Sequence, residues 1–301
     1  MYRFSIAMKK KITVFTTTFN RAYCLPQLYQ SLVSQTNKNF IWLIIDDGST
    51  DGTQSLVQNW IDAGLLQIEY IFQKNQGMHG GHNTAYQNCT TDFNVCIDSD
   101  DFMPTAAIDI ILKNCSTLPD NCAGLLGLDA NKKGEIIGTK IPENLTQVKL
   151  NELYTKYRVL GDKKIVYKTK VVRKYPLYPI FEGENLVPLD YLYLQIDQDY
   201  YLKPINKVLC IVEYMPDGST LNIYKQYRKS PKGFAVARVL SIKYGATFKV
   251  KVKNAIHLVS CAIFSNSFKM LFASNNSLLV LASVPFGVLL NAYIHFKIAR
   301  K

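Results

Sequence analysis

The stretch Val95-Cys96-Ile97-Asp98-Ser99-Asp100-Asp101 is an apolar run that ends in three carboxylates. The apolar run predicts a buried strand, and the acidic residues mark the point where that strand emerges. In an open α/β sheet, ligands bind just outside the carboxyl ends of the strands. Carboxylates this close raise one another's pKa, and a hard divalent cation relieves the repulsion. The stretch therefore predicts a metal site that holds a diphosphate, although Asp and Ser are also typical of a helix start, here before Pro104.

The residues on either side alternate predicted strands with predicted helices. Strands are predicted at 11–18, 40–45 and 66–72, with helices at 24–35 and around Leu56 and Trp60. This alternation indicates a parallel, right-handed α/β sheet. Asp46-Asp47 follows the second strand as Asp98 follows the fourth, so we expect both acidic clusters on one edge of the sheet. Further strands are predicted at 123–128, 164–167 and 208–214, with a hairpin return at 135–137 and helices at 104–115, near Leu153 and at 188–201.

The composition is that of a globular chain with two halves of opposite charge. An apolar fraction of 48% over 301 residues excludes a disordered chain. Seven cysteines without a CxxC pair indicate reduced thiols and a cytoplasmic location. Residues 1–130 hold 8 Lys and Arg against 12 Asp and Glu, whereas residues 131–301 hold 27 against 11. Beyond Asp217 there are 13 Lys and Arg and no acid, so we expect the tail to do a different task.

Five motifs follow one another along the chain, each at a predicted strand end or in a loop. They are Thr16–Arg21, Ile45–Asp51, Asn75–Asn83, Asp98–Asp101 and Phe181–Glu184. In this order and spacing the chain resembles family 2 glycosyltransferases of the GT-A fold, which are inverting enzymes that use a nucleotide sugar. The resemblance covers about residues 10–220. It implies a mixed α/β sheet flanked by helices. A cationic extension with a helical pattern follows it and lies outside the resemblance.

The resemblance implies a donor site and a metal site. Residues Thr16 to Arg21 would lie against the base and ribose, and Asp46 or Asp47 would accept a hydrogen bond from uracil or ribose. Asp98 and Asp100 match the DxD motif of the family, so Asp100, Asp98 and Asp101 are expected to hold Mn²⁺ or Mg²⁺. The implied donor-binding residues are Thr16, Phe19, Asn20, Arg21, Asp46, Asp47, Asn75, Gly77, His79, Asn83, Asp98 and Ser99. His82 is expected to pack, and Asp51 to cap a helix.

Inverting transfer needs a base that deprotonates the acceptor hydroxyl. The family supplies it from a Glu-Asp-like motif, and the matching position here reads Gly183-Glu184-Asn185, without the aspartate. Glu184 is the favoured base, Glu182 comes next and Asp190 third. An acid that is not the base would be a solvated loop residue.

Other interpretations of these motifs are weaker. The loop with Gly77, Gly80 and Gly81 lets backbone approach a ligand, but it lacks the GxGxxG order of a dehydrogenase. His79 and His82 lack a third ligand at zinc spacing. Asp197-Gln198-Asp199 also spells DxD, but it follows a helical pattern rather than a strand. A nucleotidyltransferase would need a Gly-rich basic loop after the first strand, which Thr16 to Arg21 does not provide.

The tail allows three interpretations. The run from Leu278 to Leu290 approaches transmembrane length, but Pro285 and Gly287 interrupt it. It is a membrane span, a core helix, or a segment that lies in the inner leaflet, where lysines meet anionic lipid. The last is favoured. No nucleic-acid motif is present, so nucleic acid is not expected as a partner.

These patterns together predict a metal-dependent inverting glycosyltransferase. Residues 9–220 would form the GT-A domain, with a nucleotide-binding half at about 9–128 and an acceptor-side half at 129–220, and residues 221–301 would form the membrane-associating tail. The expected donor is a nucleotide sugar, with UDP favoured, and the expected acceptor is a cell-surface polysaccharide or a lipid-linked glycan precursor. The expected location is the cytoplasm, peripheral on the inner face of the membrane. A non-catalytic module that binds sugar nucleotides or membranes is the alternative from another class.

Overall fold

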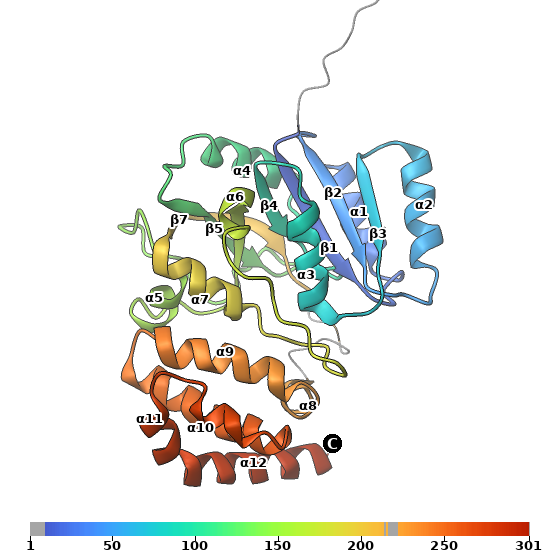
Figure 1. Cartoon of the computed structure of the whole chain (residues 1–301). Coiled ribbons are helices and arrows are strands. Elements are labelled where there is room, and N and C mark those ends of the chain that lie inside the picture. Colours follow the sequence, from blue (N-terminus) through green and yellow to red (C-terminus); the bar gives the residue numbers. More distant parts are fainter. Residues whose placement is uncertain (1–9, 214, 216–221, 301) are drawn as a thin grey trace, which may run out of the picture.

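The computed structural model describes residues 10–213, 215 and 222–300. Seven strands form one sheet in the order β3-β2-β1-β4-β6-β5-β7 (Figure 1). Their bounds are β1 (Ile12–Thr18), β2 (Phe40–Asp46), β3 (Ile68–Phe72), β4 (Phe93–Cys96), β5 (Cys122–Ala130), β6 (Lys163–Lys168) and β7 (Tyr201–Ile211). The predicted sheet and its first four strands are therefore present.

The sheet is mixed. Strands β1 to β4 run parallel to one another, as the alternation with helices predicts, whereas β6 runs antiparallel to both β4 and β5. Thr18 pairs with Asp46, and Phe15 pairs with Cys96. The carboxyl ends of β1, β2 and β4 therefore lie at one edge, where the motif residues follow them.

Helices cover both faces of the sheet and bury its apolar strands. One hydrophobic core joins the sheet to α1 (Leu25–Val33), α2 (Thr53–Ala63) and α4 (Ala107–Cys115). A second core lies on the other face under α3 (Gly77–Asn88), α5 (Leu150–Thr155), α6 (Thr169–Val172) and α7 (Asp190–Asp199). Every residue of β2 is buried, which explains its continuous apolar run.

The C-terminal residues form a separate helical layer below the sheet domain (Figure 1). It consists of α8 (Ile223–Lys229), α9 (Pro231–Tyr244), α10 (Phe248–Phe264), η2 (Phe268–Phe272), α11 (Ser277–Ala282) and α12 (Val284–Ala299). The layer has a core of its own, to which Phe234, Leu258, Val259 and Val280 contribute. Among the described residues, no helix combines the length and the apolar character needed to cross a membrane.

One local prediction was wrong and another held in part. Residues 77–83 were expected in a loop, but α3 begins at Gly77 and packs tightly on β1, where a Cβ at Gly81 would lie 2.6 Å from Thr17 Cγ2. Residues 135–137 turn back onto the end of β5 as the predicted hairpin does, with backbone hydrogen bonds from Asn131 N–H to Glu135 O and from Ile137 N–H to Asp129 O, both at 2.9 Å, but they form a bridge to Ala130 rather than a strand. The predicted domain boundary at residues 220 and 221 lies outside the described residues.

Candidate active site

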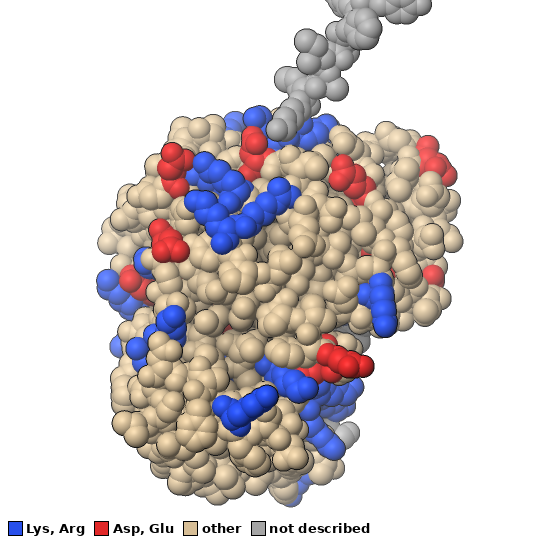
Figure 2. Space-filling view, in the orientation of Figure 1, with Lys and Arg blue, Asp and Glu red and all other residues tan. Residues whose placement is uncertain are grey.

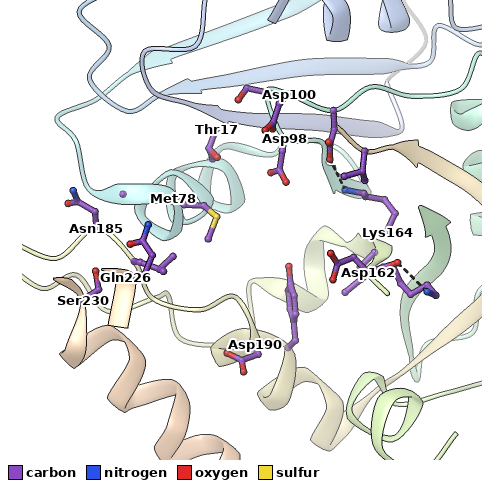
Figure 3. A pocket seen from close by; sticks show the side chains of 18 of the residues that line it. Thr17, Met78, Asp98, Asp100, Asp162, Lys164, Asn185, Asp190, Gln226 and Ser230 are labelled. Carbon is purple, nitrogen blue, oxygen red and sulfur yellow. Dashed lines mark hydrogen bonds and ion pairs between the residues drawn. The ribbon is translucent and has the colours of Figure 1, made fainter. Parts of the chain in front are cut away.

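The carboxyl edge of the sheet opens onto a cavity of about 1250 Å³ (Figure 3). One wall comes from the ends of β1, β2 and β4 and from the start of α3. A second wall comes from β6, α7 and the loop at 183–186, and the helical layer closes a third side with residues of α8, α9 and α10. The cavity is therefore lined by residues from all three predicted regions: the nucleotide-binding half, the acceptor-side half and the tail.

The acidic cluster after β4 reaches the cavity, but its carboxylates have different partners. Asp98 is exposed toward the cavity. Asp100 Oδ2 lies 2.8 Å from Arg21 Nη1, in an ion pair that is mostly shielded from solvent. Asp101 is buried, and its Oδ1 accepts a hydrogen bond from the Glu213 backbone N–H at 3.1 Å. The cluster thus presents Asp98 and Asp100 to a ligand, while Asp101 is directed toward β7.

The carboxylate oxygens of this cluster are suitable ligands for Mg²⁺ or Mn²⁺, but they complete a metal site only when a substrate supplies further ligands. In the described part of the chain, no three His, Cys, Asp or Glu side chains are grouped so that they alone could hold a metal. Mg²⁺ is usually held by one or two carboxylates together with substrate phosphates. Asp98 and Asp100 therefore fit a metal that is shared with a diphosphate, and Asp101 does not fit as a third ligand.

Lys164 projects from β6 into the same cavity and faces the acidic cluster (Figure 3). Its Nζ lies 3.9 Å from Asp101 Oδ2. Burial lowers the pKa of Lys164, but Cys210 and the carboxylates of Asp129, Asp98 and Asp101 outweigh burial and hold this pKa well above its ordinary value. Burial and the neighbouring Asp98 raise the pKa of Asp101 to about 7. Lys164 is therefore the internal counter-ion of the cluster.

The two aspartates that follow β2 organise the backbone. Asp46 is fully buried, and its carboxylate accepts hydrogen bonds from the Ser49 N–H at 2.7 Å and the Tyr70 hydroxyl at 2.6 Å. Asp47 lines the cavity, and it accepts the backbone N–H groups of Gln76 at 2.9 Å and Gly77 at 2.8 Å. Burial raises the pKa of Asp47. Asp46 does not line the cavity, so Asp47 is the one that remains near a ligand.

The motif after β1 divides between the cavity and the interior. Phe19 and Arg21 line the cavity, as do Thr17 and Thr18. Thr16 was expected beside the nucleotide, but it is fully buried and its hydroxyl accepts the Trp42 indole N–H at 3.0 Å. Strand alternation turns Thr16 to the face opposite its neighbours.

Asn20 connects two loops and does not line the cavity. Its side-chain Oδ1 accepts the Thr50 backbone N–H at 2.7 Å, and its own backbone N–H donates to Ser49 Oγ at 2.9 Å. Its φ of 53° belongs to the left-handed region, which asparagine tolerates better than most residues. Asn20 therefore links the loops that follow β1 and β2 and does not itself line the cavity.

The start of α3 contributes Asn75, Gly77 and Met78 to the cavity. At Gly77, φ is +77°, and a Cβ would lie 2.0 Å from the Asn185 carbonyl oxygen, so only glycine fits. The loop that carries Asn185 therefore packs directly against the start of α3.

Two residues of α3 that were expected at the ligand are buried instead. His79 Nδ1 accepts the Val187 backbone N–H at 3.2 Å, and burial lowers the pKa of His79 to about 4. Asn83 exchanges two 2.8 Å hydrogen bonds with the backbone of Tyr178. Both residues were displaced from their expected role by contacts with the loop at 176–187, which lies about a hundred positions away. His82 packs in the core, as expected.

The residues favoured as the base do not point into the cavity. Glu184 is buried, and its two carboxylate oxygens accept the backbone N–H groups of Lys232 at 3.0 Å and Gly233 at 2.8 Å, at the start of α9. Glu182 is exposed and does not line the cavity. Glu184 is therefore occupied with the helix N-terminus, where a carboxylate is stabilising.

Asp190, the third candidate, lies across the cavity from Asp98 at the start of α7 (Figure 3). Its Oδ1 is buried without a hydrogen-bond partner among the described residues. Burial raises the pKa of its carboxyl, and Arg238 from α9 partly offsets that rise. A carboxylate with a free oxygen and a raised pKa is a candidate proton acceptor.

Charged residues that local motifs did not predict also line the cavity, among them Asp129, Lys164 and Arg238. Asp129 directly follows the predicted strand at 123–128, so the signal that identified Asp98 was present there as well. Lys164 is a cation inside a predicted strand. Arg238 carries no such signal, because only the packing of the tail brings α9 to the cavity.

Asp197, which belongs to the second DxD sequence, caps a helix. Its carboxylate accepts the backbone N–H groups of Leu150 at 2.9 Å and Asn151 at 2.7 Å. These contacts agree with the prediction that Asp197-Gln198-Asp199 is not a metal motif.

Comparisons with known proteins agree with the geometry. The model of the family described as "Glycosyl transferase family 2" matches residues 13–175, more than half of the chain. A GalNAc(5)-diNAcBac-PP-undecaprenol beta-1,3-glucosyltransferase from Campylobacter jejuni is 24% identical over 225 residues, which cover 72% of this chain and 71% of that protein. Other curated matches cover 45% of one relative and 17% of another, so the chain spans less than half of the length of these relatives.

Two solved structures share the fold. S. aureus TarS 1-349 in complex with UDP-GlcNAc superposes with a TM-score of 0.60 at 14% identity, over 96% of this chain and 92% of that one. The mannosyltransferase PcManGT from Pyrobaculum calidifontis, in complex with GDP-Man and Mn²⁺, gives a TM-score of 0.58 at 15% identity, over 94% and 87%. The predicted GT-A fold with helices after it is therefore confirmed.

Proposed function

The chain belongs to glycosyl transferase family 2, and we propose that it is an inverting enzyme that moves a sugar from a UDP-sugar to an acceptor hydroxyl of a cell-surface polysaccharide or a lipid-linked glycan precursor. The observation that carries the proposal is the cavity itself. It has Asp98 and Asp100 on one wall and Asp190 on the other, where Asp190 Oδ1 is buried without a hydrogen-bond partner among the described residues. Diphosphate binding and proton removal from an acceptor need these two kinds of group on opposite sides of a sugar.

The donor would occupy the wall formed by β1, β2 and the start of α3. Phe19 offers an exposed ring for the base, and Asp47 and Asn75 offer acceptors and donors for the uracil or ribose. A positioned hydrogen-bonding group discriminates strongly, because a mismatched base leaves it unpaired. TarS, which was solved with UDP-GlcNAc, supports a UDP donor, whereas PcManGT was solved with GDP-Man.

Asp98 and Asp100 would hold Mn²⁺ or Mg²⁺ together with the donor diphosphate. A metal bound there supplies a Lewis acid that neutralises the departing nucleoside diphosphate. Arg21 fixes the orientation of the Asp100 carboxylate through their 2.8 Å ion pair. Lys164 compensates the buried carboxylates of Asp101 and Asp129 and also interacts with Asp98, which lowers the repulsion within the acidic cluster.

Asp190 would act as the general base. It accepts the acceptor hydroxyl proton while that oxygen attacks the anomeric carbon from the face opposite the diphosphate. The bond between the anomeric carbon and the diphosphate oxygen breaks, its electrons leave with the diphosphate, and the configuration at the carbon inverts. Burial supports this role, because the raised pKa of Asp190 makes it a stronger base than an exposed aspartate.

The acceptor would enter from the side formed by residues 129–213 and by the helical layer. The name of the C. jejuni relative includes a lipid-linked glycan, GalNAc(5)-diNAcBac-PP-undecaprenol, and this supports a lipid-linked acceptor for the present chain. Such an acceptor is held in a bilayer, so we also propose that residues 222–300 bring the enzyme to the inner face of the membrane. The cation-rich composition of this layer supports that location.

The experiment that tests the proposed function is nucleotide release from a panel of UDP-, GDP- and dTDP-sugars, with Mn²⁺ and with a chelator. Release from a UDP-sugar that the chelator abolishes supports the proposal. Binding without release in the presence of a membrane extract would favour a non-catalytic module. Release from a GDP- or dTDP-sugar alone would overturn the donor assignment.

A further inference from the structure

The outermost helix, α12, is packed on one side only. It contacts α10, α11 and α8, and the stripe that faces them consists of Gly287, Asn291 and Ile294. A Cβ at Gly287 would lie 2.3 Å from Val259 Cβ, so the two helices approach closely. Asn291 Nδ2 donates to Ser260 Oγ at 3.2 Å. The buried stripe of α12 therefore relies on a glycine and a polar residue.

The opposite side of α12 carries the larger apolar groups. Phe286, Leu289, Tyr293 and Phe296 follow one another at the spacing of one helical face, and they are 59%, 67%, 45% and 49% exposed. Tyr293 lies at the edge of this face, because its ring also contacts the Tyr224 ring of α8 with centroids 6.0 Å apart. Leu278 on the adjoining α11 is 82% exposed. A helix that is apolar all round belongs to a protein core or to a membrane, and a large exposed apolar patch marks an interaction site. We call these five residues the outer apolar face.

Cations accompany the outer apolar face, and acids do not. Lys297 Nζ lies 5.5 Å from the centre of the Tyr293 ring, and the Arg300 guanidinium lies 3.9 Å from the centre of the Phe296 ring. Residues 222–300 contain no Asp or Glu. In Figure 2, the lower part of the molecule, which this layer forms, shows tan and blue surface. A partner for this face must therefore be apolar in depth and anionic at its surface.

We propose that the outer apolar face docks on an anionic bilayer, with α11 and α12 lying in the plane of the interface. Apolar side chains would enter the acyl boundary, while Lys297 and Arg300 would meet phosphate groups of the lipids. Tyr and Phe rings next to cations suit the headgroup level. A symmetric contact with a second copy would bring two acid-free, cationic layers together, and like charges disfavour that arrangement.

The docking surface and the cavity belong to the same helical layer. Arg238 from α9 and Asn254 from α10 line the cavity, and α10 also packs against α12. A membrane that holds α12 therefore lies on the far side of one helix from the cavity. This part of the inference rests on the proposed function, because it supplies the reason for docking: the enzyme meets a lipid-linked acceptor at the bilayer.

The test is flotation of the full chain with vesicles of phosphatidylcholine, with and without phosphatidylglycerol. The wild-type chain should float with the anionic vesicles and much less with neutral ones. The double variant Leu278→Glu/Leu289→Glu should bind the anionic vesicles at least about tenfold more weakly, because two leucines lose their burial. Leu65→Glu/Leu160→Glu is the matched control, since both leucines are 62% exposed on the sheet domain, and it should float like the wild type.

Nucleotide release without vesicles separates this inference from the proposed function. The variant Leu278→Glu/Leu289→Glu should keep wild-type release from the donor in solution, since neither residue lines the cavity. Undiminished flotation of this variant would overturn the docking face even if release occurs. A wild-type chain that sediments as a dimer, does not float, and becomes monomeric in the double variant would replace the membrane with a second copy.

Discussion

Arg21 Nη1 lies 2.8 Å from Asp100 Oδ2, so the loop after β1 and the loop after β4 are joined at the cavity. The two residues are 79 positions apart in the chain, and parallel pairing of β1 with β4 brings them to one edge. The ion pair orients the carboxylate that we assign to the metal. The assignments of the metal ligand and of the base can each be tested by a single substitution.

Asp100→Asn should remove the metal-dependent part of donor binding. The neutral amide cannot replace a carboxylate ligand of Mn²⁺, so the affinity for UDP measured by calorimetry with Mn²⁺ should fall by about tenfold or more, which is about 1.4 kcal/mol per factor of ten. Asp109→Asn on the surface of α4 is the control and should bind like the wild type. Equal UDP titrations for Asp100→Asn and wild type would refute the metal assignment.

Asp190→Asn should bind the donor but not transfer the sugar. Loss of a general base costs about 10²- to 10⁴-fold in rate. The substitution keeps the shape of the side chain, so calorimetric binding of UDP should stay within about twofold of the wild type, since Asp190 lies on the opposite wall. Transfer by Asp190→Asn at the wild-type rate would exclude this residue as the base.

Glu184→Ala should destabilise the fold rather than stop the chemistry. Its carboxylate accepts two backbone N–H groups at the start of α9, so its loss should lower the free energy of unfolding by about 2 kcal/mol. Denaturant unfolding measures this change, and Glu182→Ala, an exposed neighbour, is the control. If Glu184→Ala keeps wild-type stability but loses transfer, then the base assignment must return to Glu184.

The rate of transfer should fall toward acid pH. Burial raises the pKa of Asp190 above the ordinary aspartate value, and the base is active only when deprotonated. The acid limb of the profile of kcat against pH should therefore have its midpoint above that of an exposed aspartate. Because Arg238 holds this pKa down, Arg238→Gln should move the midpoint to higher pH. An unchanged midpoint in Arg238→Gln would contradict the pairing of these two groups.

Lys164→Met should destabilise the protein more at high pH than at low pH. Without the ammonium group, Asp101 and Asp129 remain buried with raised pKa values and without their shared cation, and a larger share of these carboxyls is charged at the higher pH. Removing one partner of a buried pair costs about 3 kcal/mol, and protonation of the carboxylates recovers part of it. Urea unfolding at pH 8 and pH 5 measures the difference. A loss that is equal at both pH values would show that Lys164 is not the counter-ion.

Local sequence signals predicted which strand ends open onto the cavity, but not which side chains turn into the interior. Asp98 and Asp100 could be predicted because a strand end and its acids are adjacent in sequence, and the fold then exposes them at the edge. The buried position of Glu184 could not be predicted, because the amides that bind its carboxylate belong to Lys232 and Gly233, 48 and 49 positions later. His79 was displaced in the same way by the distant Val187. A local motif does not show which distant residues its side chains will contact, so positions that depend on long-range packing could not be predicted from it.

The tail illustrates the same limit. Its helices and its charge could be predicted from periodicity and composition, but the side of α12 that would be buried could not. Close packing at Gly287 turns Phe286 and Leu289 outward. Which of its residues reach the cavity also depends on how α9 and α10 rest on the sheet domain.

The most direct test of the account is sugar transfer from a labelled UDP-sugar to a lipid extract of native membranes, with wild type and Asp190→Asn compared at equal donor occupancy. Wild-type protein with Mn²⁺ should release UDP and label the lipid in equal amounts. Chelator should abolish both, and Asp190→Asn should bind the donor without labelling the lipid. Labelling by Asp190→Asn at the wild-type rate, or labelling that persists with chelator, would contradict the account.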